Sequence, residues 1–290
     1  MISLIKEVIL IQQLTGRCVT AMSKDQVKLH YHDYRLESLI NDGKLLEVLK
    51  FHQSTTFISG ELSGNTVSGE LKEWLETNEF KDAQPNNYNI EIPLKVPRTM
   101  FKNSIRDFDM NKKMDIDTLA NILYLSFGRD ENKQSKRYPS AGALYPVLPL
   151  IYVFNENIIK EENIPKGCYL YYGDEQKLFC LKHWSEEDLI VIKSKINLLN
   201  SSLYSNICIG YAIDIKKAIV KYGKRGYRHA LIEAGAMCQS FREVSNNINE
   251  NIGDFCWSGF ADNALTYLSG LNPRLAPITL IQWFGFRRQS

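Results

Sequence analysis

One residue pair in this 290-residue chain has the types needed to move a proton: Lys221 stands next to Tyr222. The pair opens the run Lys-Tyr-Gly-Lys-Arg-Gly-Tyr-Arg, in which four cations and two tyrosines lie within eight residues. A nearby ammonium group lowers the pKa of a phenol, and each group can act as acid or base once its pKa approaches neutrality. The pair is therefore a candidate catalytic element, and a solvated cationic loop is the alternative interpretation.

Small residues between two prolines form a second stretch of interest, from Tyr138 to Pro146. It reads Tyr-Pro-Ser-Ala-Gly-Ala-Leu-Tyr-Pro and runs directly into the apolar segment 147–154. Ser140, Ala141 and Gly142 carry little side chain, so the backbone there can come close to a flat or anionic ligand. A proline-glycine turn that leads into a strand is the alternative interpretation.

Two cations and a hydroxyl lie within five residues in a third stretch, Phe101 to Phe108. Arg106 could bind a phosphate through two parallel hydrogen bonds, Lys102 as a point charge and Ser104 as a donor. A solvated helix start is the alternative interpretation of these residue types.

The fourth stretch runs from Cys256 to Phe260 and lies between two predicted helices. Backbone amides around Ser258 and Gly259 could donate hydrogen bonds to a heteroaromatic ring, with Trp257 packed beside it. A turn that contains glycine is the alternative. The sequence has no GxGxxG motif and no P-loop, so the common dinucleotide and nucleoside-triphosphate sites are not supported.

Composition and charge exclude several classes of protein. Hydrophobic residues make up 44% and charged residues 23%, as in ordinary soluble globular proteins. The net charge of +2 is too small to argue for a nucleic-acid partner. No apolar run approaches the roughly 20 residues that span a bilayer, and residues 1–14 lack the pattern of a signal peptide. We therefore expect a cytoplasmic protein without a membrane segment.

The cysteines and histidines show no metal-ligand spacing. No two of the six cysteines form CxxC, and the five histidines are scattered. We expect buried, reduced thiols and no metal site.

Strands and helices are predicted along the whole chain, so an α+β fold is expected. Residues 1–88 are expected to form a small N-terminal α/β module, with strands in 17–31, a helical segment over 35–51 that is interrupted near Gly43, a helix over 67–77, and a linker near 83–89. Residues 89–290 form the second domain. In it we predict helices at 115–128, from 185, at 225–248 and at 262–268, and strands at 147–154, 168–172, 177–181, 206–213 and 276–284.

Small residues mark the middle of the longest predicted helix, 225–248. Ala234, Gly235 and Ala236 would let a second helix approach closely. The partner is either the core of the same chain or a second copy of it.

Taken together and in their order along the chain, the four stretches resemble the nitroreductase superfamily of FMN enzymes, and more closely its SagB/McbC-type azoline dehydrogenases. Ser104 and Arg106 match the superfamily's phosphate-binding opening, in which Lys102 and Asn103 replace two arginines. The most specific match is Tyr138 to Pro146. Residues 228–239 look like the dimer helix, residues 257–262 like the flavin-edge loop, and residues 277–285 like the closing strand.

The resemblance implies a nitroreductase-like mixed sheet flanked by helices and an FMN site. The implied cofactor-binding residues are Lys102, Ser104, Arg106, Ser140, Ala141, Gly142, Trp257, Ser258, Gly259, Arg287 and Arg288. It also implies that Lys221 and Tyr222 are catalytic: one of them takes a proton while a hydride leaves for N5 of FMN. Peptide thiazolines or oxazolines would become thiazoles or oxazoles during the synthesis of a ribosomally made, bacteriocin-like or toxin-like peptide.

The partners that the resemblance implies are the precursor peptide, cyclodehydratase subunits of the same synthetase, and a second copy of the chain. The N-terminal module could hold the precursor or dock the cyclodehydratase. Two other functions stay open at this point: an NAD(P)H-dependent nitro or quinone reductase, and a non-catalytic subunit of a peptide-modifying complex.

Overall fold

The computed structural model describes residues 34–57, 68–79, 81–82, 86–95, 103–130, 135–160 and 162–288. By their internal contacts, residues 1–41 and 42–290 form two compact units. The first unit contributes one described helix, α3 (Tyr34–Leu39). None of the described helices is both long enough and apolar enough to cross a membrane.

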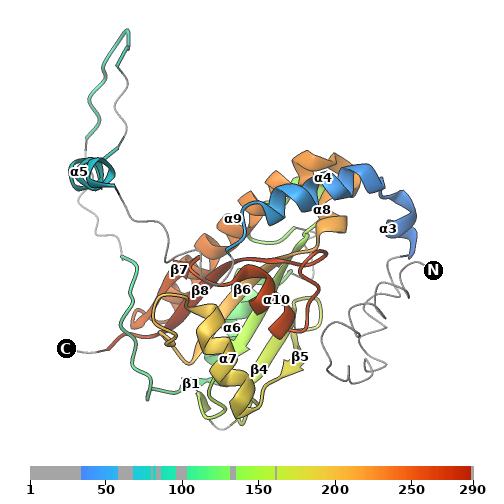
Figure 1. Ribbon diagram of the computed structural model, residues 1–290. Coiled ribbons are helices and arrows are strands. Elements are labelled where there is room, and N and C mark those ends of the chain that lie inside the picture. The colour runs from blue at the N-terminus through green and yellow to red at the C-terminus, as the bar shows by residue number, and fades with distance from the viewer. Residues whose placement is uncertain are drawn as a thin grey trace. The chain divides into compact units, whose positions relative to one another are not determined.

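A six-stranded sheet forms the centre of the second unit, with the strand order β5-β4-β2-β6-β8-β7 (Figure 1). Every neighbouring pair in it is antiparallel. The strands are β2 (Val147–Val153), β4 (Gly167–Tyr172), β5 (Lys177–His183), β6 (Ile207–Ile213), β7 (Ile252–Trp257) and β8 (Ile278–Phe286). All residues of the central strand β6 are buried, as its unbroken apolar run predicts.

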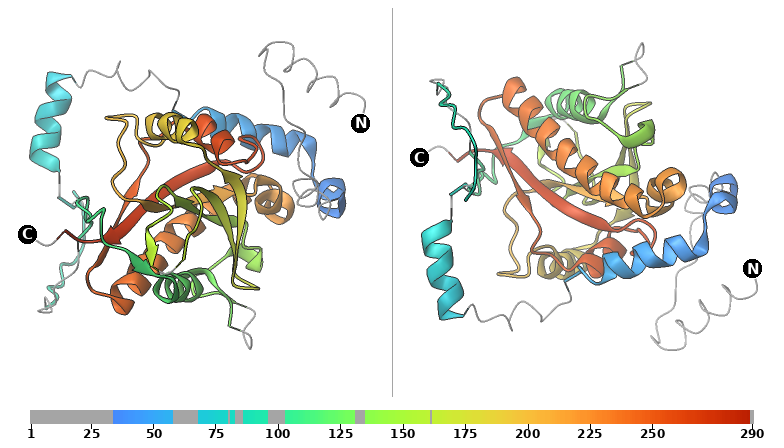
Figure 2. Two further views of the ribbon diagram at one scale, coloured as in Figure 1. Left: turned by 90° about the horizontal axis from the view of Figure 1, so that it is seen from below. Right: turned by 90° about the horizontal axis from the view of Figure 1, so that it is seen from above.

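Helices cover both faces of this sheet, and Figure 2 shows α9 (Lys224–Ile248) crossing one of them. On that face Phe241 of α9 contacts Phe284 of β8 and stacks on Phe127 of α6 (Ile116–Phe127). On the other face α7 (Glu186–Ile196) and α10 (Asp262–Leu268) pack over Trp184 and Trp283. The two hydrophobic layers fix the sheet between the helices.

The predicted start and end of α6 coincide with the observed ones, but the capping is different. Asp115 occupies the N-cap position, yet its side chain accepts no hydrogen bond from the helix. Its carboxylate instead lies 2.9 Å from Lys160 Nζ. This ion pair joins β1 (Met114–Asp115) to β3 (Ile159–Lys160), a separate parallel pair.

Residues 221–228 lie in a helical hairpin and not in the solvated cationic loop that was the alternative interpretation. Helix α8 (Ile215–Tyr222) ends at Gly223, which has a φ of +55°, and α9 begins at the next residue. A Cβ added at Gly226 would lie 1.9 Å from the Ala218 carbonyl oxygen, so only glycine lets the two helices approach this closely.

Helix α4 (Asp42–Gln53) packs on the α8–α9 hairpin. A hydrogen bond of 2.7 Å joins Tyr227 Oη to the buried His52 Nδ1. Gln53 exchanges two side-chain hydrogen bonds with Asn263 of α10, at 3.1 and 2.8 Å. The helical segment predicted over 35–51 is interrupted as expected, into α3 and α4, but the break lies at residues 40–41 and not near Gly43.

Of the other expectations for the N-terminal module, the described residues confirm the second helix but do not test the strands. Helix α5 (Gly69–Asn78) lies where a helix was predicted, and Ser68 Oγ caps it by accepting from Leu71 N at 3.2 Å. The predicted strands at 17–31 lie outside the described residues. The boundary at residue 88 stays a prediction, and α4 belongs to the same compact unit as the sheet.

Two sequence expectations were wrong in detail. Strand β7 was not predicted, and Cys256 and Trp257 form its end rather than a turn. Cys180 and Cys256 are exposed, whereas Cys168, Cys208 and Cys238 are buried, and these five thiols are free. The six-stranded sheet is antiparallel throughout. Among the described residues, parallel strands occur only in the separate β1–β3 pair. The α+β class is confirmed.

Candidate functional site

The structure brings Gly142 against Lys221 and Tyr222, which we call the lysine–tyrosine cluster. A Cβ added at Gly142 would lie 2.8 Å from Tyr222 Oη and 3.0 Å from Lys221 Nζ. Lys221 Nζ also lies 5.3 Å from the centroid of the Tyr222 ring. The turn at Tyr138 to Pro146 and the run that begins at Lys221 therefore meet, and a side chain at Gly142 would have to displace Tyr222 or Lys221.

The turn that carries Gly142 is held in an unusual conformation. Gly142, Ala143 and Tyr145 have φ values of 66°, 55° and 48°, and non-glycine residues rarely adopt such values. Ser140 Oγ accepts from Tyr145 N at 2.9 Å, and the Ser140 carbonyl oxygen accepts from Ala143 N at 3.1 Å. The hydroxyl of Ser140 is therefore turned into the fold, and Ala141 lies at the start of the short 3-10 turn.

Ser104, Arg106, Arg287 and Arg288 gather near the last residues of β8, and we call them the phosphate cluster. Ser104 Oγ accepts from Arg242 Nη2 at 3.0 Å. The Arg106 guanidinium lies 5.6 Å from the centroid of the Phe255 ring. Three strong cations and a hydroxyl at one edge of the sheet suit an anionic ligand such as a phosphate.

Backbone hydrogen bonds and one strong ion pair hold this cluster. Ile105 N donates to the Asp254 carbonyl oxygen at 3.0 Å, and Arg288 Nε lies 3.4 Å from Asp107 Oδ1. The buried Asp254 carboxylate accepts two hydrogen bonds from Arg242 Nε, at 3.0 and 3.1 Å. This carboxylate raises the pKa of the Arg242 guanidinium.

One atom of the phosphate cluster is left without a partner. Arg287 Nε is buried and has no hydrogen-bond partner among the described residues. A buried guanidinium N–H normally has an acceptor, since leaving it unpaired costs free energy. The orphaned donor therefore fits a site that receives a ligand oxygen.

The loop after β7 reaches the same region through an aromatic group. Trp257 packs against Tyr204, with ring centroids 5.6 Å apart, and against Phe255, the ring beneath Arg106. The indole Nε1 of Trp257 donates to the Ile196 carbonyl oxygen at 2.9 Å. Ser258 is exposed, and a Cβ added at Gly259 would lie 2.6 Å from the Trp257 ring. The stretches Phe101 to Phe108 and Cys256 to Phe260 thus share one edge of the sheet.

The two clusters lie toward opposite ends of α9. Tyr222 precedes the helix start at Lys224, whereas Arg242, which holds Ser104, follows Lys224 by 18 residues (242 − 224). At 1.5 Å per residue these positions are about 27 Å apart along the helix axis. Lys102 lies outside the described residues, so its place relative to either cluster stays a prediction.

Two buried polar residues beside the lysine–tyrosine cluster were missed in the sequence. Glu233 is 2% exposed, and its Oε1 has no hydrogen-bond partner in the described part of the chain. His229 Nδ1 is likewise buried and unpaired there, and its ring lies edge-on to Tyr222. The only sequence signal was a glutamate inside the apolar stripe of the long helix.

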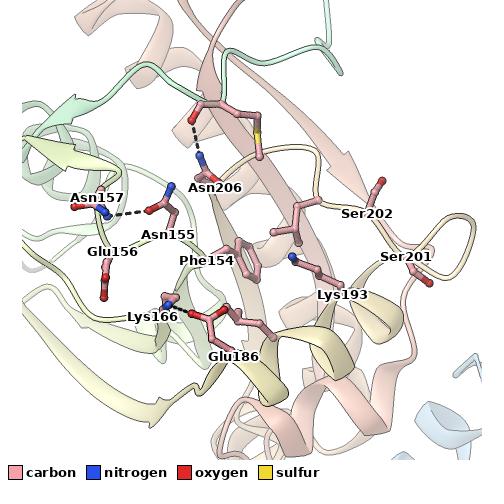
Figure 3. Close-up of a pocket in the computed structure, with 13 residues that line it drawn as sticks. Phe154, Asn155, Glu156, Asn157, Lys166, Glu186, Lys193, Ser201, Ser202 and Asn206 are labelled. Atoms are coloured by element: carbon pink, nitrogen blue, oxygen red, sulfur yellow. Dashed lines mark hydrogen bonds and ion pairs between the residues drawn. The ribbon is translucent and has the colours of Figure 1, made fainter.

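A larger pocket of about 650 Å³ opens elsewhere, near the end of β2, and contains none of the predicted site residues (Figure 3). Several of its polar side chains are paired with other side chains or with the backbone. Lys166 binds Glu186, and Asn206 Nδ2 donates to the Met110 carbonyl oxygen at 2.7 Å. Volume alone therefore does not make it the functional site. Within the described residues, no three His, Cys, Asp or Glu side chains gather in a metal-binding arrangement.

Comparison with known proteins shows which proteins this chain resembles. No protein-family model matches the chain. It is 26% identical over 286 residues to the microcin B17-processing protein McbC of Escherichia coli, covering 91% of this chain and 97% of McbC. A structure of the E. coli microcin synthetase McbBCD complex with truncated pro-MccB17 bound contains a chain that matches with a TM-score of 0.74 and 22% identity. The match covers 89% of this chain and 98% of that one.

More distant structures share the fold alone. A nitroreductase-like protein of Ralstonia eutropha matches with a TM-score of 0.51 and 13% identity, over 69% of this chain and 89% of that one. A nitroreductase-like protein of Anabaena variabilis matches with a TM-score of 0.50 and 20% identity. The match covers 64% of this chain and 36% of that one. These likenesses confirm the resemblance predicted from the sequence: the chain is similar to McbC over nearly its whole length and has the nitroreductase fold.

Proposed function

We propose that the protein is an FMN-dependent dehydrogenase that oxidises thiazolines or oxazolines in a precursor peptide to thiazoles or oxazoles. The observation that carries the proposal is the contact of Gly142 with Lys221 and Tyr222. It joins the signature turn of the flavin enzymes to a residue pair able to move a proton. The likeness to McbC extends over nearly the whole of both chains and supports the same activity.

The residues present fit FMN. Arg106, Arg287 and Arg288 offer three cations for its phosphate, and Arg287 Nε offers a donor that has no acceptor within the described part of the chain. At the other cluster, Ala141 and Gly142 leave the backbone uncovered for a ring. When bound, FMN supplies the two-electron acceptor that no side chain can replace.

The lysine–tyrosine cluster supplies the proton chemistry. Aromatisation of an azoline removes a proton from a ring carbon, and Tyr222 or Lys221 takes it as general base. The turn at Gly142 fixes the positions of both groups, because Tyr222 Oη and Lys221 Nζ contact it from one side. A base held in one place can work at each substrate ring in turn.

A second copy of the chain completes the site. A flavin gripped by the phosphate cluster of one copy cannot also touch the lysine–tyrosine cluster of the same copy about 27 Å along α9. The outer face of α9 offers a surface for the second copy, because Leu231 and Ile232 are exposed there. A Cβ added at Gly235 would meet no atom within 4 Å, so this face is open. In such a dimer, the phosphate cluster of one copy faces the lysine–tyrosine cluster of the other copy.

Other subunits and the precursor complete the assembly. A chain of the McbBCD complex, solved with a truncated precursor bound, has the fold of this chain over 98% of its length. By analogy the protein works beside a cyclodehydratase that makes the azoline from Cys, Ser or Thr. Residues 1–88 are proposed to dock that partner or the precursor.

Absorbance and turnover test the proposal. We expect the purified protein to be yellow and to oxidise an azoline peptide, and the double variant K221A/Y222F to stay yellow but lose at least about a hundredfold in rate. Lys216→Ala on α8 is the matched lysine control. Normal turnover by the double variant would disprove the catalytic assignment. Anaerobic bleaching by NADPH, without any response to azoline peptide, would favour a nitro or quinone reductase instead.

A further inference from the structure

Glu233 lies beneath the turn that carries Gly142 and takes no part in the chemistry described above. It is 2% exposed, and its Oε1 has no hydrogen-bond partner within the described ranges. A polar atom buried in this way is costly unless a water or another group satisfies it. The carboxyl also receives hydrogen bonds from Ser140 and from the backbone of Val147. One acceptor position is therefore left open.

His229 presents a second unsatisfied atom close by. It stands four residues before Glu233 on α9, so the two side chains share one face of the helix. Its Nδ1 is buried and has no partner among the residues that the structure describes. The ring meets Tyr222 edge-on, with centroids 5.2 Å apart and an interplanar angle of 76°.

Both residues line one small cavity between α8, α9 and the turn. Its volume is about 10 Å³, and its walls include Ala141, Tyr222, His229 and Glu233. This is close to the minimum that a single water molecule needs, and two unsatisfied polar atoms give that water partners.

We propose that one water in this cavity joins Glu233 Oε1 to His229 Nδ1, and that Glu233 is thereby a positioning residue for Tyr222. The inference rests on the proposed function. Glu233 acts along two routes that end at the same phenol. One passes through Ser140 to Gly142, which contacts Tyr222 Oη. The other passes through the water to His229, which contacts the Tyr222 ring.

Charged groups on the neighbouring elements decide how this network responds to pH. Burial raises the pKa of Glu233, while the hydrogen bonds from Ser140 and Val147 and the charges of Lys136 and Lys217 lower it. Burial raises the pKa of Tyr138, and the negative charge of Glu233 raises it further. As the pH falls through the raised pKa of Glu233, the carboxyl becomes protonated and the network loses its charged acceptor. Turnover should fall with it.

The variant E233Q tests the proposal, because glutamine keeps the shape and cannot titrate. We expect kcat for azoline oxidation to fall about tenfold with KM nearly unchanged, the flavin to stay bound, and the acid limb of the pH profile that belongs to Glu233 to disappear. Glu243→Gln is the matched control, since Glu243 is an exposed glutamate on the same helix. An unchanged acid limb in a folded, yellow E233Q would overturn the proposal.

A double-mutant cycle with H229F tests the connection through water. Phenylalanine keeps a ring against Tyr222 but removes Nδ1. We expect H229F to lower kcat by a similar factor, and E233Q/H229F to be no slower than the slower single variant. Losses that multiply would show that the two residues act separately. If E233Q does not fold, H229F with the pH profile of E233D takes its place.

The location of the water gives a readout that does not depend on turnover. A crystal structure of the holoenzyme should show one water between Glu233 Oε1 and His229 Nδ1, and a dry cavity would overturn the proposal. A wild-type enzyme that oxidises no azoline, yet has this water, would instead contradict the proposed function alone.

Discussion

The lysine–tyrosine cluster and the phosphate cluster are built by opposite means. The first depends on missing side chains: Gly142 admits Tyr222 and Lys221, and Gly226 lets α8 and α9 touch. The second depends on charge, through the pairing of Arg242 with the buried Asp254. A packing defect should therefore disable one end of α9, and an electrostatic defect the other.

The largest effect is expected from D254N at the phosphate end. Asp254 accepts hydrogen bonds from Arg242 and, at 2.7 Å, from Gln282 Nε2. Removal of its charge leaves Arg242 without its ion-pair partner, and we expect unfolding free energy to fall by about 3 kcal/mol. Flavin affinity should fall as well, because Arg242 then releases Ser104. Urea unfolding and a flavin titration measure both.

Asp107 provides the control for this charge change. Its carboxylate pairs with Arg288 at the exposed surface, where both side chains are more than half accessible. D107N should change unfolding free energy by less than about 0.5 kcal/mol. A loss as large as that of D254N would mean that burial is not what makes Asp254 important.

The next largest effect is expected from G226A, which disturbs the packing of α8 against α9 at the lysine–tyrosine end. The added Cβ meets the Ala218 carbonyl oxygen, a backbone atom that cannot turn aside. We expect a loss of about 2–3 kcal/mol in unfolding free energy. Because α8 carries Tyr222, azoline oxidation should fall further than flavin binding. Gly69→Ala, where a Cβ meets nothing within 4 Å, is the matched control and should be close to neutral.

A smaller, pH-dependent effect is expected at α4, which contacts α9 near its lysine–tyrosine end, at Tyr227. Burial lowers the pKa of His52 below 6.5, so the unfolded chain takes up the proton first. Stability from the His52–Tyr227 contact is therefore full above about pH 6.5 and is lost as the pH falls below it. H52Q should cost about 1 kcal/mol at neutral pH and flatten this dependence. Denaturation above and below about pH 6.5 tests it. An equal pH dependence in H52Q would exclude His52 as the cause.

Local patterns predicted most elements, and contacts between distant residues explain the failures. The β4–β5 hairpin, α7 and α10 were predicted because turn, capping and periodic residues lie within each segment. Strand β7 was missed, since Gly253 and Asp254 are poor strand formers and only its pairing with β8 makes it a strand. Helix α8 was missed because its lysines suggested a loop.

The same reasoning holds for the candidate site. The residue types of Lys221 and Tyr222 were readable, but their contact with Gly142 joins residues far apart in the sequence. The role of Glu233 was hidden, since a glutamate on a helix is usually exposed and only the fold buries it.

The docking of α4 has a consequence for the order in which the protein folds. Its hydrogen bonds reach from His52 to Tyr227 and from Gln53 to Asn263, separations of 175 and 210 residues. During synthesis at about 5–20 residues per second, α4 leaves the ribosome roughly 10–35 s before Tyr227. Such long-range contacts form late. A helix that is made early in synthesis is thus among the last to reach its place.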